Sequence, residues 1–171
     1  MGASNRGGEA SGSSIVTTSR FVFVFLFGFV LLYLPARLFA IVVWPARIGA
    51  SQIGGILICG AGAAIGLLCV FNFALIGRGT PAPFAPPRRL VTRGPYRFVR
   101  NPMYMGVGVF FAGAAVFYQS NVLLAYVVLF VTASHFFVVL YEEPTLRRTF
   151  GSEYSKYCSR VARWWPHLYR S

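Results

Sequence analysis

Four apolar stretches, each near the length that crosses a lipid bilayer, constrain this chain more than any other feature. They cover residues 21–44, 53–76, 102–118 and 122–141. A helix needs about 20 consecutive apolar residues to span the hydrocarbon core. Charged residues make up only 12% of the chain, about half the share in an ordinary soluble domain. The sequence therefore predicts an all-α, polytopic integral membrane protein with about four transmembrane helices.

The first of these stretches is interrupted by Pro35 and Arg37. It forms either one kinked span or a span followed by an interfacial segment. Residues 1–20, rich in Ser and Gly, are expected to be a disordered tail, and the apolar run after them is expected to be a retained anchor rather than a cleaved signal. We divide the chain into this tail, two N-terminal spans over 21–76, and a core over 77–171.

The distribution of charge predicts how the chain lies across the membrane. Lys and Arg number 16 against 4 acidic residues, a net charge of +12. The basic residues concentrate in the 78–101 loop and the 147–170 tail, whereas the 119–121 connection has none. Cytosolic segments attract Lys and Arg. We therefore expect both termini, the Pro-rich 77–95 loop and an amphipathic C-terminal tail to face the cytosol and its anionic lipids, with no nucleic-acid partner.

The third span opens at Asn101-Pro102. Asn is a favoured N-cap and Pro is favoured at the first helical position, so the pair predicts a helix start. The free N–H groups at such a start can also bind an anion. Arg97 and Arg100 flank the same point.

An adjacent acidic pair, Glu142 and Glu143, follows the fourth span in a chain with only 4 acidic residues. The short 119–121 connection makes the third and fourth spans antiparallel neighbours. At about 1.5 Å per residue, one climbs roughly 24 Å and the other descends roughly 30 Å. The glutamates should therefore lie at the depth of Arg97 and Asn101. His135 precedes Glu142 by two turns and is either an intramembrane functional group or a neutral partner of a hydroxyl such as that of Tyr104.

Several glycines suggest close helix packing. Gly62 and Gly66 in the second span have the small-residue spacing that brings helix backbones together in lipid. In the third span, Gly106, Gly108, Ala112 and Gly113 either pack tightly in the same way or leave room for an acyl or prenyl chain.

A set of motifs in the second half of the chain resembles the isoprenylcysteine carboxyl methyltransferase superfamily, which includes the phospholipid N-methyltransferases. The resemblance covers residues 77–166. It rests on Gly94-Pro95-Tyr96-Arg97, Arg100-Asn101-Pro102-Met103-Tyr104-x-Gly106, Tyr141-Glu142-Glu143-Pro144, Phe150-Gly151-x-Glu153-Tyr154-x-x-Tyr157 and Val161-x-Arg163-x-x-Pro166.

This resemblance implies a methyltransferase that binds S-adenosylmethionine among its membrane helices and takes a lipophilic acceptor from the bilayer. The cofactor-binding positions that it implies are Tyr96, Arg97, Arg100, Asn101, Pro102, Tyr104, Glu142 and Glu143. The catalytic candidates are Arg100, Tyr104, His135 and Glu143, of which Tyr104, His135 and Glu143 are able to take a proton from an amine acceptor. No metal-ligand spacing of Cys and His is present.

The acceptor itself stays open between a carboxylate, an amine and a thiol. Enzymes of the superfamily that act on prenylcysteine typically have His at the position of Asn101 and arginine before the glutamates, whereas residues 136–141 here contain none. Three other functions are the alternatives to a methyltransferase: an NADPH-dependent membrane reductase, a non-enzymatic membrane protein or small transporter, and a metal-dependent hydrolase. The sequence does not indicate the oligomeric state.

Overall fold

The computed structural model describes residues 28, 31, 33–41, 45, 47–72, 75 and 90–166 of the chain. These residues are almost entirely helical. The elements are α2 (Leu34–Ile41), α3 (Ala50–Asn72), the 3₁₀ helix η3 (Gly94–Arg97), α4 (Pro102–Tyr118), α5 (Asn121–Phe137), the π-helical turn η4 (Val138–Glu142) and α6 (Glu143–Arg160). The expected tail over 1–20, most of the first span, and the loop over 76–89 lie outside the described residues.

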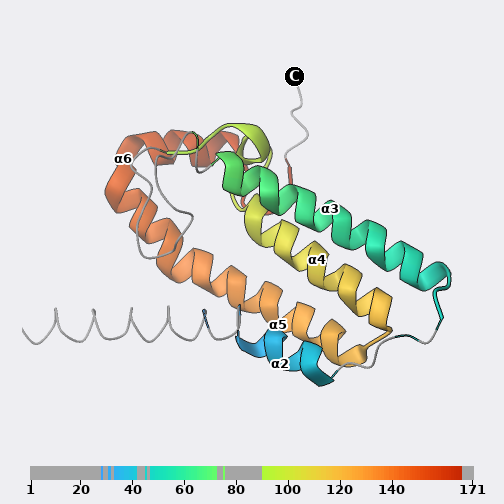
Figure 1. Ribbon diagram of the computed structural model, residues 1–171. Helices are drawn as coiled ribbons and strands as arrows, with labels where there is room; N and C mark the ends of the chain where they lie inside the picture. Colours follow the sequence, from blue (N-terminus) through green and yellow to red (C-terminus); the bar gives the residue numbers. More distant parts are fainter. Residues whose placement is uncertain are drawn as a thin grey trace, which may run out of the picture.

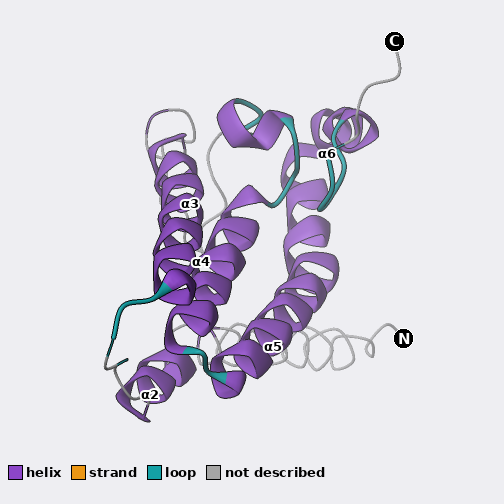
Figure 2. Ribbon diagram, turned by 90° about the vertical axis from the view of Figure 1, so that its right-hand side faces the viewer, coloured by secondary structure: helices purple, strands orange, loops and turns teal. Residues whose placement is uncertain are grey.

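Three long helices, α3, α4 and α5, lie side by side, and α6 crosses one end of them (Figures 1 and 2). The predicted antiparallel pairing of α4 and α5 is confirmed. Their turn is tight because Gln119 takes a left-handed conformation (φ 50°) and the Ser120 hydroxyl caps α5 by accepting a hydrogen bond from the Leu123 N–H at 3.3 Å. The start of α4 at Pro102, with Asn101 as N-cap, is also confirmed.

Glycines bring the backbones of α3 and α4 into direct contact. A Cβ added at Gly55 would lie 2.6 Å from the Phe117 nitrogen. A Cβ at Gly62 would clash with the backbone of Gly106 and Phe110. Gly66 itself faces open space, but its nitrogen would lie 3.0 Å from a Cβ on Gly106. Close packing therefore explains Gly55, Gly62 and Gly106.

The outer faces of the long helices are apolar. Leu57 and Leu67 on α3 are 69% and 70% exposed, and Val128 on α5 is 63% exposed. α3 and the helical run Asn121–Arg160 are long and apolar enough to cross a membrane, whereas α4 is a shorter apolar helix of 17 residues. Apolar residues exposed along whole helices are typical of a surface that faces lipid.

The helix that contains α5 does not end at the two glutamates, as the sequence suggested. It widens into the π turn η4 and continues as α6, whose first turn holds Pro144. Gly151 then breaks the helical path with φ 50° and ψ −120°, a conformation that favours glycine. The chain after α6, which we call the strap (residues 161–164), runs back to η3 and forms a parallel bridge between Val99 and Ala162.

Candidate functional site

The N-terminus of α4 is held by the strap rather than by its own cap. The Asn101 side chain makes no capping hydrogen bond. Its amide instead donates to the Arg163 carbonyl at 3.2 Å, and the Arg100 N–H donates to the Ala162 carbonyl at 2.9 Å. The motif residues at the start of α4 therefore fix the strap over this end of the helix bundle.

Glu143 is enclosed by two arginines. Arg163 binds it with two parallel hydrogen bonds, from Nε to Oε1 at 2.7 Å and from Nη2 to Oε2 at 2.9 Å. Arg100 adds an ion pair at 3.1 Å. Burial acts to raise the pKa of Glu143, but the Arg163 hydrogen bonds and the two positive charges outweigh it and hold the pKa below its ordinary value. This carboxylate is therefore charged, and both of its oxygens contact arginine side chains.

Glu142 has a different environment, although it is the next residue. Its Oε2 accepts a hydrogen bond from the Tyr104 hydroxyl at 2.9 Å. Burial and the neighbouring charge of Glu143 raise the pKa of Glu142, while the Tyr104 hydrogen bond partly opposes them. Such a carboxylate takes up a proton more readily than Glu143 does.

Both glutamates line a small cavity beneath α6, which we call the carboxylate cavity. It encloses about 60 Å³. Its walls combine acidic, basic, amide and aromatic groups: Leu90, Val91, Tyr96, Arg100, Asn101, Glu142, Glu143, Leu146, Tyr154 and Tyr157. The Tyr157 hydroxyl donates to the Tyr96 carbonyl at 2.6 Å, which ties α6 to η3 across the cavity.

A second cavity, of about 290 Å³, lies between α4 and α5. We call it the α4–α5 cavity. Its lining residues are Tyr104, Met105, Gly108, Val109, Ala112, Phe130, Val131, Ser134 and Trp164. Tyr104 lines this cavity and Glu142 lines the carboxylate cavity, so the 2.9 Å hydrogen bond between them links one wall residue of each.

The structure brings together most of the residues that the sequence singled out. Tyr96, Arg100, Asn101, Glu142 and Glu143 line one cavity, and Pro102 forms the first turn of the helix behind them. Tyr104 lines the α4–α5 cavity, and two further candidates, Arg97 and His135, line neither cavity. The Arg97 guanidinium stacks on the exposed Phe98 ring at 4.6 Å.

His135 also lies outside both cavities. Its Nδ1 accepts a hydrogen bond from the Trp164 indole at 3.1 Å. The sequence had left His135 open between a functional group and a partner of a hydroxyl such as that of Tyr104; the structure gives it an indole partner.

Sequence reasoning missed three contributors to the site: Arg163, Tyr157 and Ser134. Arg163 and Tyr157 belong to the motifs but had no assigned role, because Arg163 reaches Glu143 only through the return of the strap and Tyr157 reaches Tyr96 only through the path of α6. Ser134 gave no signal, since a single serine in an apolar span is ordinary.

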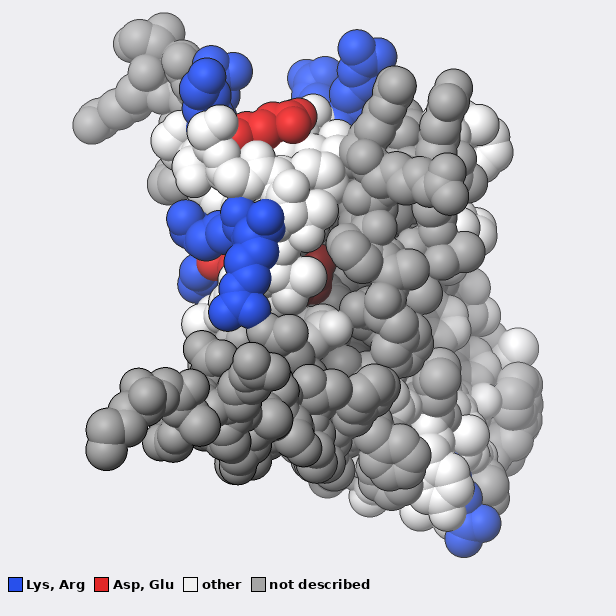
Figure 3. Space-filling model, turned by 90° about the vertical axis from the view of Figure 1, so that its left-hand side faces the viewer, with Lys and Arg blue, Asp and Glu red and all other residues white. Residues whose placement is uncertain are grey.

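Charged side chains gather at the α6 end of the molecule (Figure 3). The described basic residues of the 90–100 segment, α6 and the strap are Arg93, Arg97, Arg100, Arg147, Arg148, Lys156, Arg160 and Arg163, and Arg100 lines the carboxylate cavity. Of the described basic residues, Arg37 and Arg47 belong to the other end of the bundle, around α2 and the start of α3.

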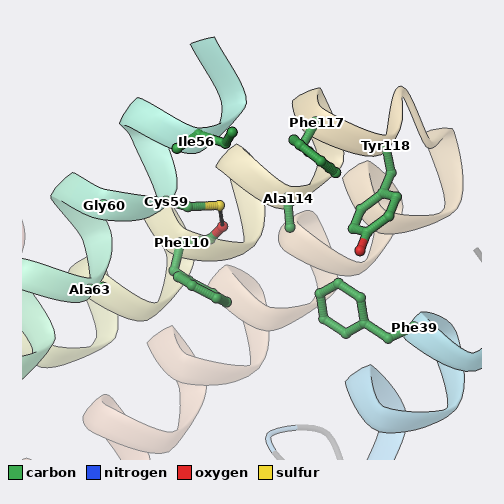
Figure 4. A pocket seen from close by; sticks show the side chains of 9 residues that line it. All are labelled: Phe39, Ile56, Cys59, Gly60, Ala63, Phe110, Ala114, Phe117 and Tyr118. Atoms are coloured by element: carbon green, nitrogen blue, oxygen red, sulfur yellow. Dashed lines mark hydrogen bonds between the residues drawn. The ribbon is translucent and has the colours of Figure 1, made fainter. Parts of the chain in front are cut away.

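A third cavity of about 460 Å³ lies between α2, α3 and α4 (Figure 4). Phe39, Phe117 and Tyr118 form much of its wall, and the Cys59 thiol donates to the Phe110 carbonyl at 3.2 Å. It is larger than the other two, but its lining is apolar and shares no residue with them. The chemistry-bearing groups therefore belong to the two joined cavities.

Comparison with known proteins identifies one family. The family described as phospholipid methyltransferase matches residues 50–153, which include α3, α4, α5 and most of α6. No curated protein and no solved structure matches the chain.

Proposed function

The chain belongs to the phospholipid methyltransferase family of integral membrane enzymes that use S-adenosylmethionine, and from this premise we propose that it methylates a lipophilic acceptor where its two cavities meet. The observation that carries the proposal is the Tyr104–Glu142 hydrogen bond. It joins a polar cavity of mixed charge to an apolar cavity between helices.

The carboxylate cavity suits the amino-acid end of the cofactor. Glu142 has lone pairs left for an ammonium group, while Arg100, Asn101 and the N-terminus of α4 suit a carboxylate. Glu143 is occupied by two arginines, so we assign it to holding the strap and Arg100 in place. At about 60 Å³ the cavity is smaller than ordinary ligand pockets of about 300 Å³ or more. Binding therefore requires its walls to move apart.

S-adenosylmethionine supplies a methyl group on a sulfonium, which is already a good leaving group. The protein's task is then to align the acceptor and to exclude water. Tyr104 lines the α4–α5 cavity, and we assign it to orienting the nucleophile and, when the acceptor is an amine, to taking its proton.

The α4–α5 cavity favours a neutral nucleophile. None of its described lining residues is basic, and a carboxylate buried there would have no counter-charge. An amine or a thiol therefore suits the cavity better than the carboxylate of a prenylcysteine. The opening between helices allows the acceptor to arrive from the bilayer, where each methylene already gains about 0.8 kcal/mol.

We further propose that residues 77–171 form the catalytic core and that the α6 end faces the cytosol. The described residues of both joined cavities fall between Leu90 and Trp164. The basic residues around this end agree with a cytosolic side, where Lys and Arg are enriched.

The test is transfer of a labelled methyl group. Purified protein in lipid nanodiscs is incubated with methyl-labelled S-adenosylmethionine and a total lipid and thiol extract, and the products are identified by mass spectrometry. We expect label in one class of organic-phase product that carries an amine or a thiol. Label confined to water-soluble products would contradict a lipophilic acceptor.

A further inference from the structure

Two consecutive residues of the strap, Arg163 and Trp164, contact different cavities. Arg163 hydrogen-bonds Glu143, and its carbonyl accepts from Asn101; both partners line the carboxylate cavity. Trp164 lines the α4–α5 cavity, and its indole donates to His135 at 3.1 Å. The two cavities share no lining residue. A movement of the strap therefore changes both cavities at once.

The strap is packed more weakly than the helices beside it. Its residues 162–164 are only partly buried, and the hydrogen bond of Trp164 is exposed. The C-terminal part of α6 is fixed instead by the buried hydrogen bond from Tyr157 to the Tyr96 carbonyl and by the apolar cluster to which Tyr157 belongs. Segments with few buried apolar contacts and exposed hydrogen bonds are those that open locally. The strap is therefore the element that moves most easily near the carboxylate cavity.

We propose that the strap is the gate of the cofactor site and that Trp164 completes the α4–α5 cavity only when this gate is closed. The carboxylate cavity holds about 60 Å³, against about 300 Å³ or more for ordinary ligand pockets. Lifting the strap withdraws Arg163 from Glu143 and releases Asn101, so the walls can part. The same movement takes Trp164 out of the wall of the α4–α5 cavity. The chain therefore imposes an order in which the carboxylate cavity fills before the α4–α5 cavity.

His135 acts as the latch of this gate. Its hydrogen bond with Trp164 ties the end of the strap to α5. Because His135 lines neither cavity, it is a positioning residue that acts through Trp164. This inference rests on the proposed function, because it places the cofactor in the carboxylate cavity.

A reversible cross-link tests the gate without requiring methyl transfer. The three native cysteines are replaced by alanine, and Val99→Cys and Ala162→Cys are introduced at the bridge between the strap and the 90–100 segment of the full-length protein in detergent. Neighbouring strands lie about 4.8 Å apart, within the Cα separation of about 4.4–6.8 Å that a disulfide bridges. Intact mass confirms the bond.

We expect the oxidised protein to bind labelled S-adenosylhomocysteine about tenfold or more weakly than the reduced protein, because apparent affinity falls with the fraction of protein that can open. Label that is added before oxidation should be retained through gel filtration and released by a reductant.

The latch is tested by the rate at which S-adenosylhomocysteine dissociates. His135→Leu removes the acceptor of the Trp164 hydrogen bond, so dissociation should be about twofold to tenfold faster, as expected for one net hydrogen bond. His135→Gln keeps an acceptor oxygen and should restore the slower rate. Thr132→Val, at an exposed position of α5 outside both cavities, is the matched control and should leave the rate unchanged.

Equal binding of S-adenosylhomocysteine by the oxidised and reduced proteins would overturn the gate. A dissociation rate that His135→Leu leaves unchanged would overturn the latch. Protein that binds no S-adenosylhomocysteine in the reduced state would contradict the proposed function, and the gate with it.

Discussion

Two adjacent glutamates, Glu142 and Glu143, have opposite environments at the boundary between η4 and α6. Glu143 meets two guanidiniums and keeps its charge, whereas Glu142 meets a phenol and has a raised pKa. The π turn that ends at Glu142 changes the helical register locally, and π turns of this kind recur at functional sites. In the proposed function, Glu143 therefore has a structural role and Glu142 a role in binding and reaction.

The division predicts different effects of removing each charge. Glu142→Gln should weaken the binding of S-adenosylhomocysteine by about 1.5–3 kcal/mol, since one charge-assisted contact is lost. Glu143→Gln leaves Arg100 and Arg163 without their carboxylate, so it should lower the free energy of unfolding by about 1.5–3 kcal/mol. Calorimetry and thermal unfolding in detergent measure the two effects. Equal losses of affinity, with unchanged unfolding in both variants, would contradict the assignment.

Among the elements, α3 and α4 form the closest contact, and it depends on particular glycines. Gly62→Ala should destabilise the protein by about 1–3 kcal/mol, because the new Cβ would meet the α4 backbone. Gly66→Ala is the matched control, since a Cβ there meets nothing within 4 Å. Thermal unfolding of both variants in detergent checks this. Similar stability for the two would argue against the α3–α4 packing.

The α4–α5 cavity gives a second prediction at this scale. A Cβ at Gly108 lies 3.8 Å from the Phe130 ring, in ordinary contact, so a larger side chain there extends into the cavity rather than into the backbone. Gly108→Leu should raise the KM for the lipophilic acceptor several-fold and leave cofactor affinity nearly unchanged. Steady-state kinetics and calorimetry separate the two quantities. A loss of cofactor affinity with an unchanged KM would place the acceptor elsewhere.

For the molecule as a whole, the sequence allowed the antiparallel pair α4–α5 to be predicted, and with it the depth of the two glutamates near the start of α4. The lengths of the two helices and the short 119–121 connection between them determine those features. The path of the chain after Glu143 was not predictable. It depends on the π turn and on the backbone break at Gly151. It also depends on hydrogen bonds that Asn101 and Arg163 make to residues 62 and 20 positions away, respectively. Such long-range contacts leave no periodic pattern in the sequence.

The orientation of the whole molecule is tested by cysteine labelling. With Cys59, Cys69 and Cys158 replaced by alanine, single cysteines at Ser120 and Thr92 report on opposite ends of α4. We expect a membrane-impermeant maleimide to label Ser120→Cys in intact cells and Thr92→Cys only after permeabilisation, since basic segments favour the cytosol. Labelling of both from one side would contradict the proposed arrangement of spans.

The central claim is that methyl transfer occurs where Tyr104 and Glu142 join the two cavities. Its most direct test is the single-turnover rate of methyl transfer from labelled S-adenosylmethionine into the lipid phase by Tyr104→Phe, with S-adenosylhomocysteine affinity measured on the same sample. The account predicts a rate lower by about a hundredfold or more, as for loss of a positioned proton-transfer group, with nearly unchanged cofactor affinity. A wild-type rate in Tyr104→Phe would contradict it.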